Sequence, residues 1–167
     1  MTLDDRQIRR LIDRTDILET MYTYTRHADR LDWDAMVSMF TDDCVVSYIE
    51  GEPLMVGRAA LHEMLSTYLP NTVSSIHYLS NSQVLFDSED VATVHTYMYS
   101  WQRYKPYPVM ADCHRYGQYE IRMVRTQEGW RFTHMRLLSH GEYGGARIAE
   151  QMNQPWPPVF DNIGSAP

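Results

Sequence analysis

The sequence predicts an α+β fold, in which N-terminal helices pack on a strongly curved mixed or antiparallel sheet. Stretches with helical periodicity dominate the chain up to about residue 70, with one short predicted strand among them. Four long stretches rich in Val, Thr, Tyr, Phe and Trp then follow, over residues 73–86, 90–104, 112–126 and 130–140. Helices followed by a run of strands are typical of α+β domains. Where such a sheet curls, its open end is a natural ligand cavity.

The chain is long enough for one domain with a core of its own. It has 167 residues, of which 44% are hydrophobic and 22% charged, as in ordinary folded domains. We expect a single domain over residues 1–145 and a C-terminal tail over residues 146–167. Twelve Tyr and eleven Met residues suit the lining of a pocket for a bulky apolar ligand. The alternative is a core that is simply rich in tyrosine.

A long first helix is predicted from about Asp4 to Arg30. Positions three and four residues apart share one face, which we expect to pack against the core. These positions are Leu11, Thr15, Leu18, Tyr22, Thr25 and Asp29. A carboxylate on this face needs a partner, because burying an unpaired charge costs several kcal/mol. The alternative is that Asp29 lies at a frayed helix end and points to water.

Two shorter helices and one strand complete the first half. Residues 31–34 break the long helix, and Asp32 fits the N-cap of a short helix that ends at Phe40. Residues 44–49 form the first predicted strand, which ends in the turn-like residues 50–53. Gly57 begins another helix and Pro70 ends it.

The four predicted strands of the second half are joined by turns of different lengths. Hairpin turns are predicted at residues 87–89 and 128–129, and the longer connection 105–110 is expected at the rim of a pocket. After His140 the strand pattern ends. The tail contains a proline-rich segment at residues 155–158, and we expect it to pack over a surface or a neighbouring subunit.

Charge and motif patterns argue against several classes of function. Fifteen basic against twenty-two acidic residues give a formal net charge of −7, which argues against nucleic acid as a partner. No stretch approaches the ~18 apolar residues that span a bilayer, and no secretory signal pattern opens the chain. Cys44 and Cys113 match no zinc or disulfide spacing. We therefore expect a cytoplasmic protein with no membrane partner.

The partner of Asp29 is expected among the seven histidines. His77 lies within a predicted strand, away from charged runs, where a neutral imidazole needs a hydrogen-bond partner. His95, His114 and His134 also lie in predicted strands, so position does not choose between them. A histidine satisfied within the core is the alternative for each. No HExxH motif, close ligand pair or glycine-rich phosphate loop is present, so we expect neither a metal nor a cofactor.

Four short segments, in order and spacing, resemble one known family. They are Ala28-Asp29-Arg30-Leu31-Asp32-Trp33-Asp34, Thr41-Asp42-Asp43-Cys44-Val45-Val46-Ser47-Tyr48, Ser75-Ile76-His77-Tyr78 and Glu128-Gly129-Trp130-Arg131-Phe132. The chain resembles SnoaL-like proteins of the nuclear transport factor 2-like superfamily over residues 5–140. Within it, the chain resembles the scytalone dehydratase, bile acid 7α-dehydratase and hexachlorocyclohexane dehydrochlorinase branches.

This resemblance implies a cone-shaped α+β barrel with a cofactor-free Asp–His dyad inside. It also implies a homo-oligomer, usually a trimer. By position, Asp29 matches the aspartate of the family and His77 its catalytic base. Tyr48 matches a pocket tyrosine of both dehydratase branches, and Tyr24 a second tyrosine of the bile acid branch. These four residues form the expected catalytic group.

The resemblance further implies a substrate-binding group of Trp101, Tyr119, His114 and Arg136. Trp101 stands where the scytalone dehydratase branch has a histidine, and we expect it to form a wall of the pocket. Tyr119 replaces an asparagine, Gly117 a serine, and Arg136 aligns with a late arginine of the bile acid branch. Because this group departs from the family pattern, scytalone is not the expected substrate.

The expected function is a cofactor-independent lyase of the dehydratase type. Asp29 would orient His77, which would remove a carbon-bound proton from an apolar cyclic hydroxy-carbonyl substrate before water leaves. An isomerase or cyclase in the same pocket is the second expectation. A non-catalytic module for small-molecule binding or assembly is the third, because a fold does not fix a function.

Overall fold

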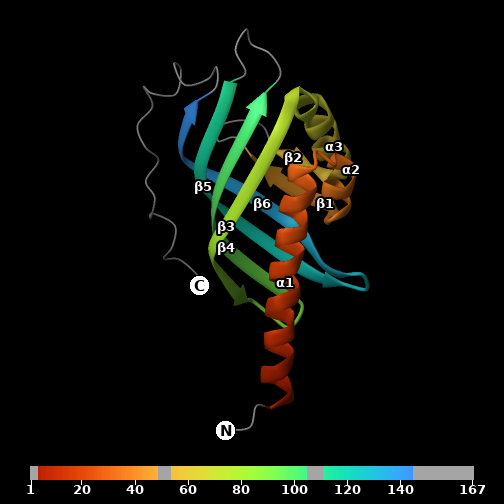
Figure 1. Cartoon of the computed structure of the whole chain (residues 1–167). Coiled ribbons are helices and arrows are strands. Elements are labelled where there is room, and N and C mark those ends of the chain that lie inside the picture. Colours follow the sequence, from red (N-terminus) through yellow and green to blue (C-terminus); the bar gives the residue numbers. More distant parts are fainter. Residues whose placement is uncertain (1–3, 49–53, 105–110, 145–167) are drawn as a thin grey trace.

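The computed structural model describes residues 4–48, 54–104 and 111–144, and Figure 1 shows helices laid on one curved sheet. The helical elements are α1 (Asp5–Asp29), α2 (Trp33–Ser38), α3 (Gly57–Tyr68) and the 3₁₀ turn η1 (Leu69–Asn71). The strands are β1 (Phe40–Ser47), β2 (Met55–Val56), β3 (Thr72–Phe86), β4 (Val91–Tyr104), β5 (Ala111–Thr126) and β6 (Gly129–Gly144).

The sheet has six strands in the order β2-β1-β6-β5-β4-β3. β1 runs parallel to β6, and all other neighbouring pairs are antiparallel. The long strands curve around α1, while α2 and α3 lie beside β1 and β2 (Figure 1). This arrangement confirms the predicted α+β class with a mixed sheet. In the part of the chain described here, no helix is long and apolar enough to cross a membrane.

The predicted elements are confirmed with small shifts at their ends. The four long strands begin and end within one residue of the prediction, except that β6 continues to Gly144. β1 begins at Phe40 rather than Cys44, with the polar residues between them on the strand. The short strand β2 had no signal in the sequence. The expectations for residues 49–53, 105–110 and the tail lie outside the described residues.

The caps of the two N-terminal helices follow from short polar side chains. Asp4 Oδ1 accepts from the Gln7 main-chain N–H at 2.7 Å, and Gln7 Oε1 accepts from the Asp4 N–H at 3.0 Å. This capping box satisfies two of the N–H groups that a helix start leaves unpaired. Asp32 caps α2 as predicted, by accepting from the Ala35 N–H at 3.1 Å.

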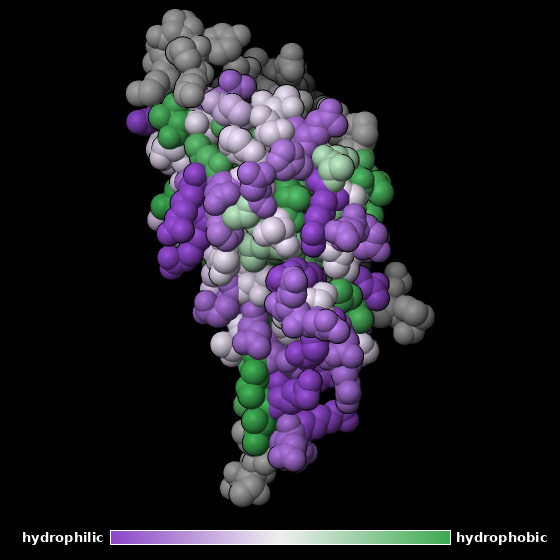
Figure 2. Space-filling view, turned by 90° about the vertical axis from the view of Figure 1, so that its right-hand side faces the viewer, coloured by the Kyte–Doolittle hydropathy of each residue, from purple (hydrophilic) through white to green (hydrophobic). Residues whose placement is uncertain are grey.

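The predicted buried stripe of α1 was wrong by about one residue. The buried residues are Asp13, Ile17, Met21, Tyr24, Thr25 and Ala28, whereas Leu11 is 54% and Tyr22 38% exposed. The first turns of α1 project beyond the strands (Figure 1), so there is no core for their apolar side chains to join. Figure 2 shows hydrophobic side chains along this projecting end, where Ile8 and Ile12 are 43% and 55% exposed.

The two faces of the long strands carry different side chains. We call the face that carries His77 and packs against α1 the inner face, and the opposite one the outer face. On β4 the buried inner residues are Ala92, Val94, Thr96, Met98 and Ser100; on β5 they are Cys113, Tyr119, Ile121 and Met123. The inner face, α1 and β1 enclose the core, which includes Phe40, Phe132 and Trp130.

One glycine on the inner face is fixed by the close approach of two strands. Gly117 lies at the bulge where the pairing of β5 with β6 shifts. A Cβ atom at this position would lie 2.4 Å from the main-chain oxygen of Leu138, which is far inside van der Waals contact. Gly117 therefore allows a backbone approach that the serine expected from the family pattern would prevent.

Candidate active site

Asp29 and His77 meet where the end of α1 packs on β3. His77 Nδ1 lies 2.7 Å from Asp29 Oδ1, and the His77 main-chain N–H donates to Asp29 Oδ2 at 3.2 Å. The pair is mostly shielded, since 10% of the His77 side chain and 25% of the Asp29 side chain are exposed. One carboxylate therefore holds both the imidazole and the backbone of His77.

This contact determines which imidazole nitrogen carries the proton. An ionised carboxylate only accepts hydrogen bonds, so Nδ1 carries the hydrogen and donates it to Asp29. Ser75 Oγ lies 3.5 Å from the same nitrogen, at the limit of a hydrogen bond. No side chain of the described residues hydrogen-bonds to Nε2. The Nε2 lone pair is therefore available as a base.

Tyr24 of α1 and Tyr48, directly after β1, share a hydrogen bond between their hydroxyl groups. The Tyr24 ring packs edge-on against Phe40 and Phe132, with ring centroids 5.8 Å and 5.4 Å apart. Burial is the main cause that raises the pKa of both phenols above the ordinary value. Both hydroxyl groups therefore stay protonated. Because one of them donates to the other, one proton of the pair is left for a further hydrogen bond.

Tyr119 of β5 lies on the same inner face and is 5% exposed. Burial raises its pKa to about 12, with the Arg115 charge opposing the rise and the Asp29 charge adding to it. The Tyr119 hydroxyl is thus within electrostatic range of both the dyad and Arg115. Of the expected substrate-binding residues, Tyr119 is the one that the structure brings together with the dyad.

Trp101 and His114 lie on the outer face, contrary to the prediction. Trp101 pairs with Ile76 and with His114, one position out of phase with His77 and its partner Ser100. Directly paired residues point to the same face of a sheet, and neighbours along a strand to opposite faces. Arg103, also on the outer face, places its guanidinium 5.2 Å from the Trp101 ring centroid. Trp101 therefore does not line the dyad.

Aromatic rings surround His114 on this outer face. The Tyr99 hydroxyl lies 2.9 Å from His114 Nδ1, and the Tyr143 ring lies 5.9 Å from the imidazole. Tyr99 also stacks on Tyr78 at 6.0 Å and contacts Tyr116 at 5.2 Å. Part of the unusual tyrosine content is therefore on the outside of the sheet and not in a pocket.

Arg136 is also on the outer face, and therefore does not lie beside the dyad. It pairs with Glu120 across β5 and β6, and its Nε atom lies 3.4 Å from Glu120 Oε2. Half of its side chain, 51%, is exposed. Strand alternation also exposes His134, two positions earlier.

The sequence interpretation missed a set of polar residues in line with His77. The register pairs His77 with Ser100, Ser100 with Arg115 and Arg115 with Glu142, across β3 to β6. All four therefore lie on the inner face. The sequences of β4 and β5 show that alternate residues share a face of the sheet. Only the strand register shows that Ser100, and not Trp101, lies on the face of His77.

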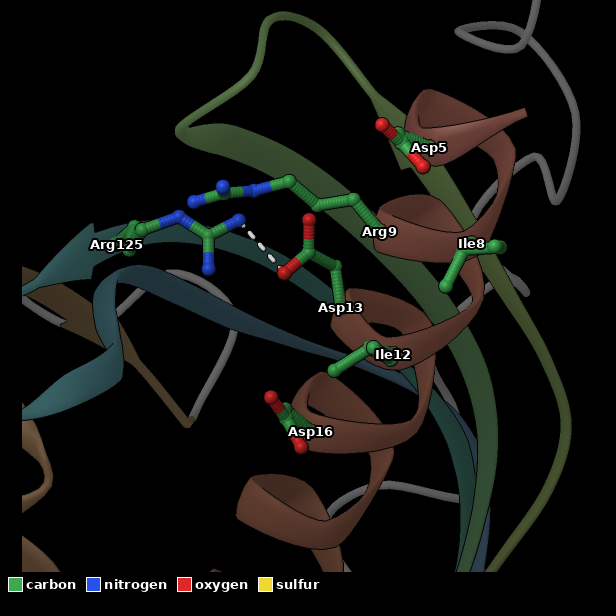
Figure 3. A pocket seen from close by; sticks show the side chains of 7 residues that line it. All are labelled: Asp5, Ile8, Arg9, Ile12, Asp13, Asp16 and Arg125. Atoms are coloured by element: carbon green, nitrogen blue, oxygen red, sulfur yellow. Dashed lines mark ion pairs between the residues drawn. The ribbon is translucent and has the colours of Figure 1, made fainter.

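A pocket of about 410 Å³ lies at the other end of α1. It is lined by Asp5, Ile8, Arg9, Ile12, Asp13, Asp16 and Arg125. Figure 3 shows Asp13 and Arg125 pointing toward each other, with Arg125 Nη2 2.7 Å from Asp13 Oδ1. At 1.5 Å per residue, Asp13 is about 24 Å from Asp29 along the helix axis. This pocket is therefore separate from the dyad.

Another histidine–aspartate contact lies on the surface. His62 Nε2 is 2.8 Å from Asp34 Oδ1, but 45% and 80% of the two side chains are exposed. Among the residues that the structure describes, no group of three or more His, Cys, Asp or Glu side chains is placed to hold a metal ion. The shielded Asp29–His77 pair is therefore the candidate active site.

The curved six-stranded sheet with helices packed against its inner face defines an α+β class of protein. Residues 9–136 match the model of the SnoaL-like domain. The chain therefore belongs to the SnoaL-like domain family, and the resemblance found in its sequence is confirmed.

Several solved structures are similar over most of the chain. A candidate scytalone dehydratase from Novosphingobium aromaticivorans is 26% identical, with a TM-score of 0.75 and coverage of 81% of this chain and 89% of that one. A candidate aromatic ring hydroxylase from the same organism has the same identity and TM-score, covering 81% and 94%. A hexachlorocyclohexane dehydrochlorinase, 19% identical with a TM-score of 0.73 and covering 84% and 94%, shows the fold alone. No curated protein matches the chain.

Proposed function

We propose that this protein is a cofactor-independent lyase that eliminates water from an apolar cyclic hydroxy-carbonyl compound. The observation that carries this proposal is the 2.7 Å contact between His77 Nδ1 and Asp29 Oδ1. It leaves Nε2 of a shielded imidazole without a hydrogen-bond partner among the described residues. A histidine held in this way can act as a general base.

In the proposed reaction, His77 Nε2 takes the proton from the carbon next to the substrate carbonyl. The electron pair of that C–H bond forms an enolate, while Asp29 stabilises the imidazolium. Tyr24 and Tyr48 stay protonated, and the hydroxyl whose proton is not used between them donates to the enolate oxygen directly or through water. The enolate then re-forms the carbonyl and expels hydroxide from the next carbon. The proton on Nε2 joins this hydroxide, and water leaves.

The relatives support the type of reaction and leave the substrate open. The names dehydratase and dehydrochlorinase both describe eliminations, and they belong to proteins with the same fold. Membership of the family does not by itself fix an activity. The substrate class rests on the largely apolar inner face, where Met98, Ile121 and Leu137 are buried.

Turnover of cyclic β-hydroxy ketones tests the proposal. With 3-hydroxy-1-tetralone as the probe, we expect the loss of one water and the formation of 1-naphthol. Mass spectrometry measures this conversion. His77→Ala and Asp29→Asn should each lower kcat by about 10²–10⁴-fold, the usual contribution of a general base. The melting temperature of each variant checks that the fold is retained.

The matched control is His62→Ala, which removes the exposed histidine of the surface His–Asp contact. It should keep wild-type turnover. Near-normal activity of His77→Ala would contradict the role of the dyad. Exchange of the α-proton for deuterium without loss of water would identify an isomerase instead. Absence of both turnover and exchange over a panel of such ketones would favour a binding module.

A further inference from the structure

A polar row crosses the inner face from the dyad toward β6. It begins at His77 and passes through the paired residues Ser100, Arg115 and Glu142. Neighbouring strands are about 4.8 Å apart, so the Cα atom of Arg115 is about 10 Å from that of His77. This spacing is comparable to the length of a fused two-ring molecule with its carbonyl group. One such molecule can contact both residues.

Glu142 holds Arg115 in place within this row. Arg115 Nη2 lies 3.2 Å from Glu142 Oε2, with 22% and 8% of the two side chains exposed. The Cys113 thiol donates to the other carboxylate oxygen, Oε1, at 2.8 Å. Burial, with this hydrogen bond, raises the pKa of Cys113 to about 12, so the thiol remains a donor. Both oxygens of Glu142 are therefore engaged.

Arg115 keeps hydrogen-bonding capacity toward the interior. A guanidinium has five N–H donors and no acceptor, and the described residues accept one hydrogen bond from its side chain. Its charge acts on the phenol of Tyr119, on which the charge of Asp29 also acts. Arg115 and the dyad therefore border the same region of the inner face, with Tyr119 within range of both.

We propose that Arg115, held by Glu142, is a substrate-binding residue that hydrogen-bonds to a second, uncharged carbonyl oxygen of the substrate. This oxygen is distinct from the carbonyl next to the carbon that His77 deprotonates and lies about one fused ring system away from that carbon. This proposal rests on the proposed function for the position of the reacting carbon. It narrows the substrate to a neutral oxygenated ring compound whose acceptor oxygen lies on the side facing β5.

The charge balance of the row favours a neutral oxygen over a carboxylate. Glu142 already compensates the charge of Arg115, so a ligand carboxylate would add a second negative charge beside the first in a region poor in water. Burying an unpaired charge costs several kcal/mol. A carbonyl oxygen accepts from the remaining N–H donors without that cost. The negative charge of Glu142 therefore makes the site bind a neutral carbonyl ligand in preference to a carboxylate ligand.

Equilibrium binding of three matched probes tests this proposal without turnover. The probes are 1-tetralone, tetralin, which lacks the oxygen, and 1,2,3,4-tetrahydro-1-naphthoate, which carries a carboxylate. The wild type should bind the ketone about tenfold or more tightly than the hydrocarbon, as a hydrogen bond from a charged donor provides. Arg115→Met should weaken ketone binding about tenfold and leave tetralin binding unchanged within twofold.

The variant Glu142→Gln removes the negative charge beside Arg115 but keeps a side-chain oxygen that can accept its hydrogen bond. It should strengthen carboxylate binding about tenfold while ketone binding changes less than threefold, because removal of one buried charge is worth at least this much. Arg115→Met leaves Glu142 without its partner, and if that variant is unstable, Arg115→Met/Glu142→Leu removes both charges together. This double variant should also lose the preference for the ketone. No gain in carboxylate binding by Glu142→Gln would overturn the neutral selectivity.

Arg103→Met is the matched control. Arg103 forms an ion pair with Asp112 on the outer face of β4 and β5, with Nε and Oδ1 2.7 Å apart. The variant should keep the ketone preference. Equal or undetectable wild-type binding of ketone and hydrocarbon, or an equal loss of both in Arg115→Met, would refute the role of Arg115. If instead the proposed catalytic role of the dyad were wrong, His77→Ala would keep its activity and these binding preferences would be unchanged.

Discussion

At the scale of single residues, one carboxylate determines how the candidate base is presented. Asp29 contacts both Nδ1 and the main-chain N–H of His77. The imidazole is therefore fixed in tautomer and in position relative to its own strand. The sequence alone placed Asp29 in the outermost turn of a helix and left four strand histidines open. The family resemblance selected His77, and the distance between the two side chains required the fold.

The hydrogen bond between the buried hydroxyl groups of Tyr24 and Tyr48 is expected to contribute to stability. Removing one hydroxyl with Tyr48→Phe leaves the Tyr24 hydroxyl buried without its partner, which should cost about 1–3 kcal/mol in the free energy of unfolding. In Tyr24→Phe/Tyr48→Phe neither ring has an unpaired hydroxyl, so the double variant should be more stable than Tyr48→Phe alone. Urea denaturation measures both. A simple sum of two losses would show that the hydroxyl groups stabilise the fold independently.

At the scale of elements, α1 shows where periodicity misleads. Apolar residues mark both its buried face and its projecting end, so the predicted stripe included Leu11, which is exposed. The true face includes Asp13, whose partner Arg125 is on a hairpin more than one hundred residues later. A local pattern cannot show that partner. The capping residues Asp4 and Asp32, in contrast, act within one turn and could be predicted.

Asp13 is expected to stabilise the docking of α1. Its side chain is 4% exposed and pairs with Arg125 at 2.7 Å. Asp13→Asn should lower the free energy of unfolding by about 1–3 kcal/mol, less than a fully buried pair would cost, because Arg125 also contacts Asp90. Thermal or urea denaturation measures the change.

The control for this experiment is Asp16→Asn, about one turn further along the same helix, where the residue is exposed and not buried as Asp13 is. We expect it to change stability by less than about 0.5 kcal/mol. If both variants lost stability equally, the net charge of the helix would account for the effect rather than the Asp13–Arg125 contact.

Strand register was the main source of error in the predicted site. The bounds of β4 and β5 could be predicted almost to the residue, since β-branched and aromatic residues mark them. Which of their faces meets α1 depends on pairing with β3. A shift of one residue exchanges Ser100 for Trp101 on the inner face. The resemblance placed Trp101 in a pocket wall, but it lies on the outer face for this reason, whereas Tyr119 lies on the inner face.

At the scale of the whole molecule, stability should fall in alkaline solution. Tyr119 has a pKa of about 12 in the fold and about 10 when unfolded. Above pH ~10 the unfolded chain therefore loses this proton while the folded chain keeps it, and stability falls by about 1.4 kcal/mol per pH unit for each such proton. Cys113, also raised to about 12, adds to the fall from a lower pH.

Urea denaturation between pH 8 and pH 11.5 measures this dependence. Tyr119→Phe should flatten the fall above pH ~10, and Cys113→Ser should flatten it between pH ~9 and ~12. Tyr143→Phe, at a position that is 72% exposed, is the matched control and should follow the wild type. Parallel curves for Tyr119→Phe and the wild type would contradict the argument.

The parallel pairing of β1 with β6 affects the order in which the chain folds during its synthesis. Phe40 pairs with Phe132, and Val46 with Met135, so β1 pairs with β6 only after the last strand has been synthesised, whereas its other neighbour β2 follows soon after it. Until then, the edge of β1 that pairs with β6 has no partner. Contacts this distant in sequence form slowly, on the order of milliseconds to seconds. We therefore expect this edge of the nascent chain to stay open until the late β5–β6 hairpin has formed.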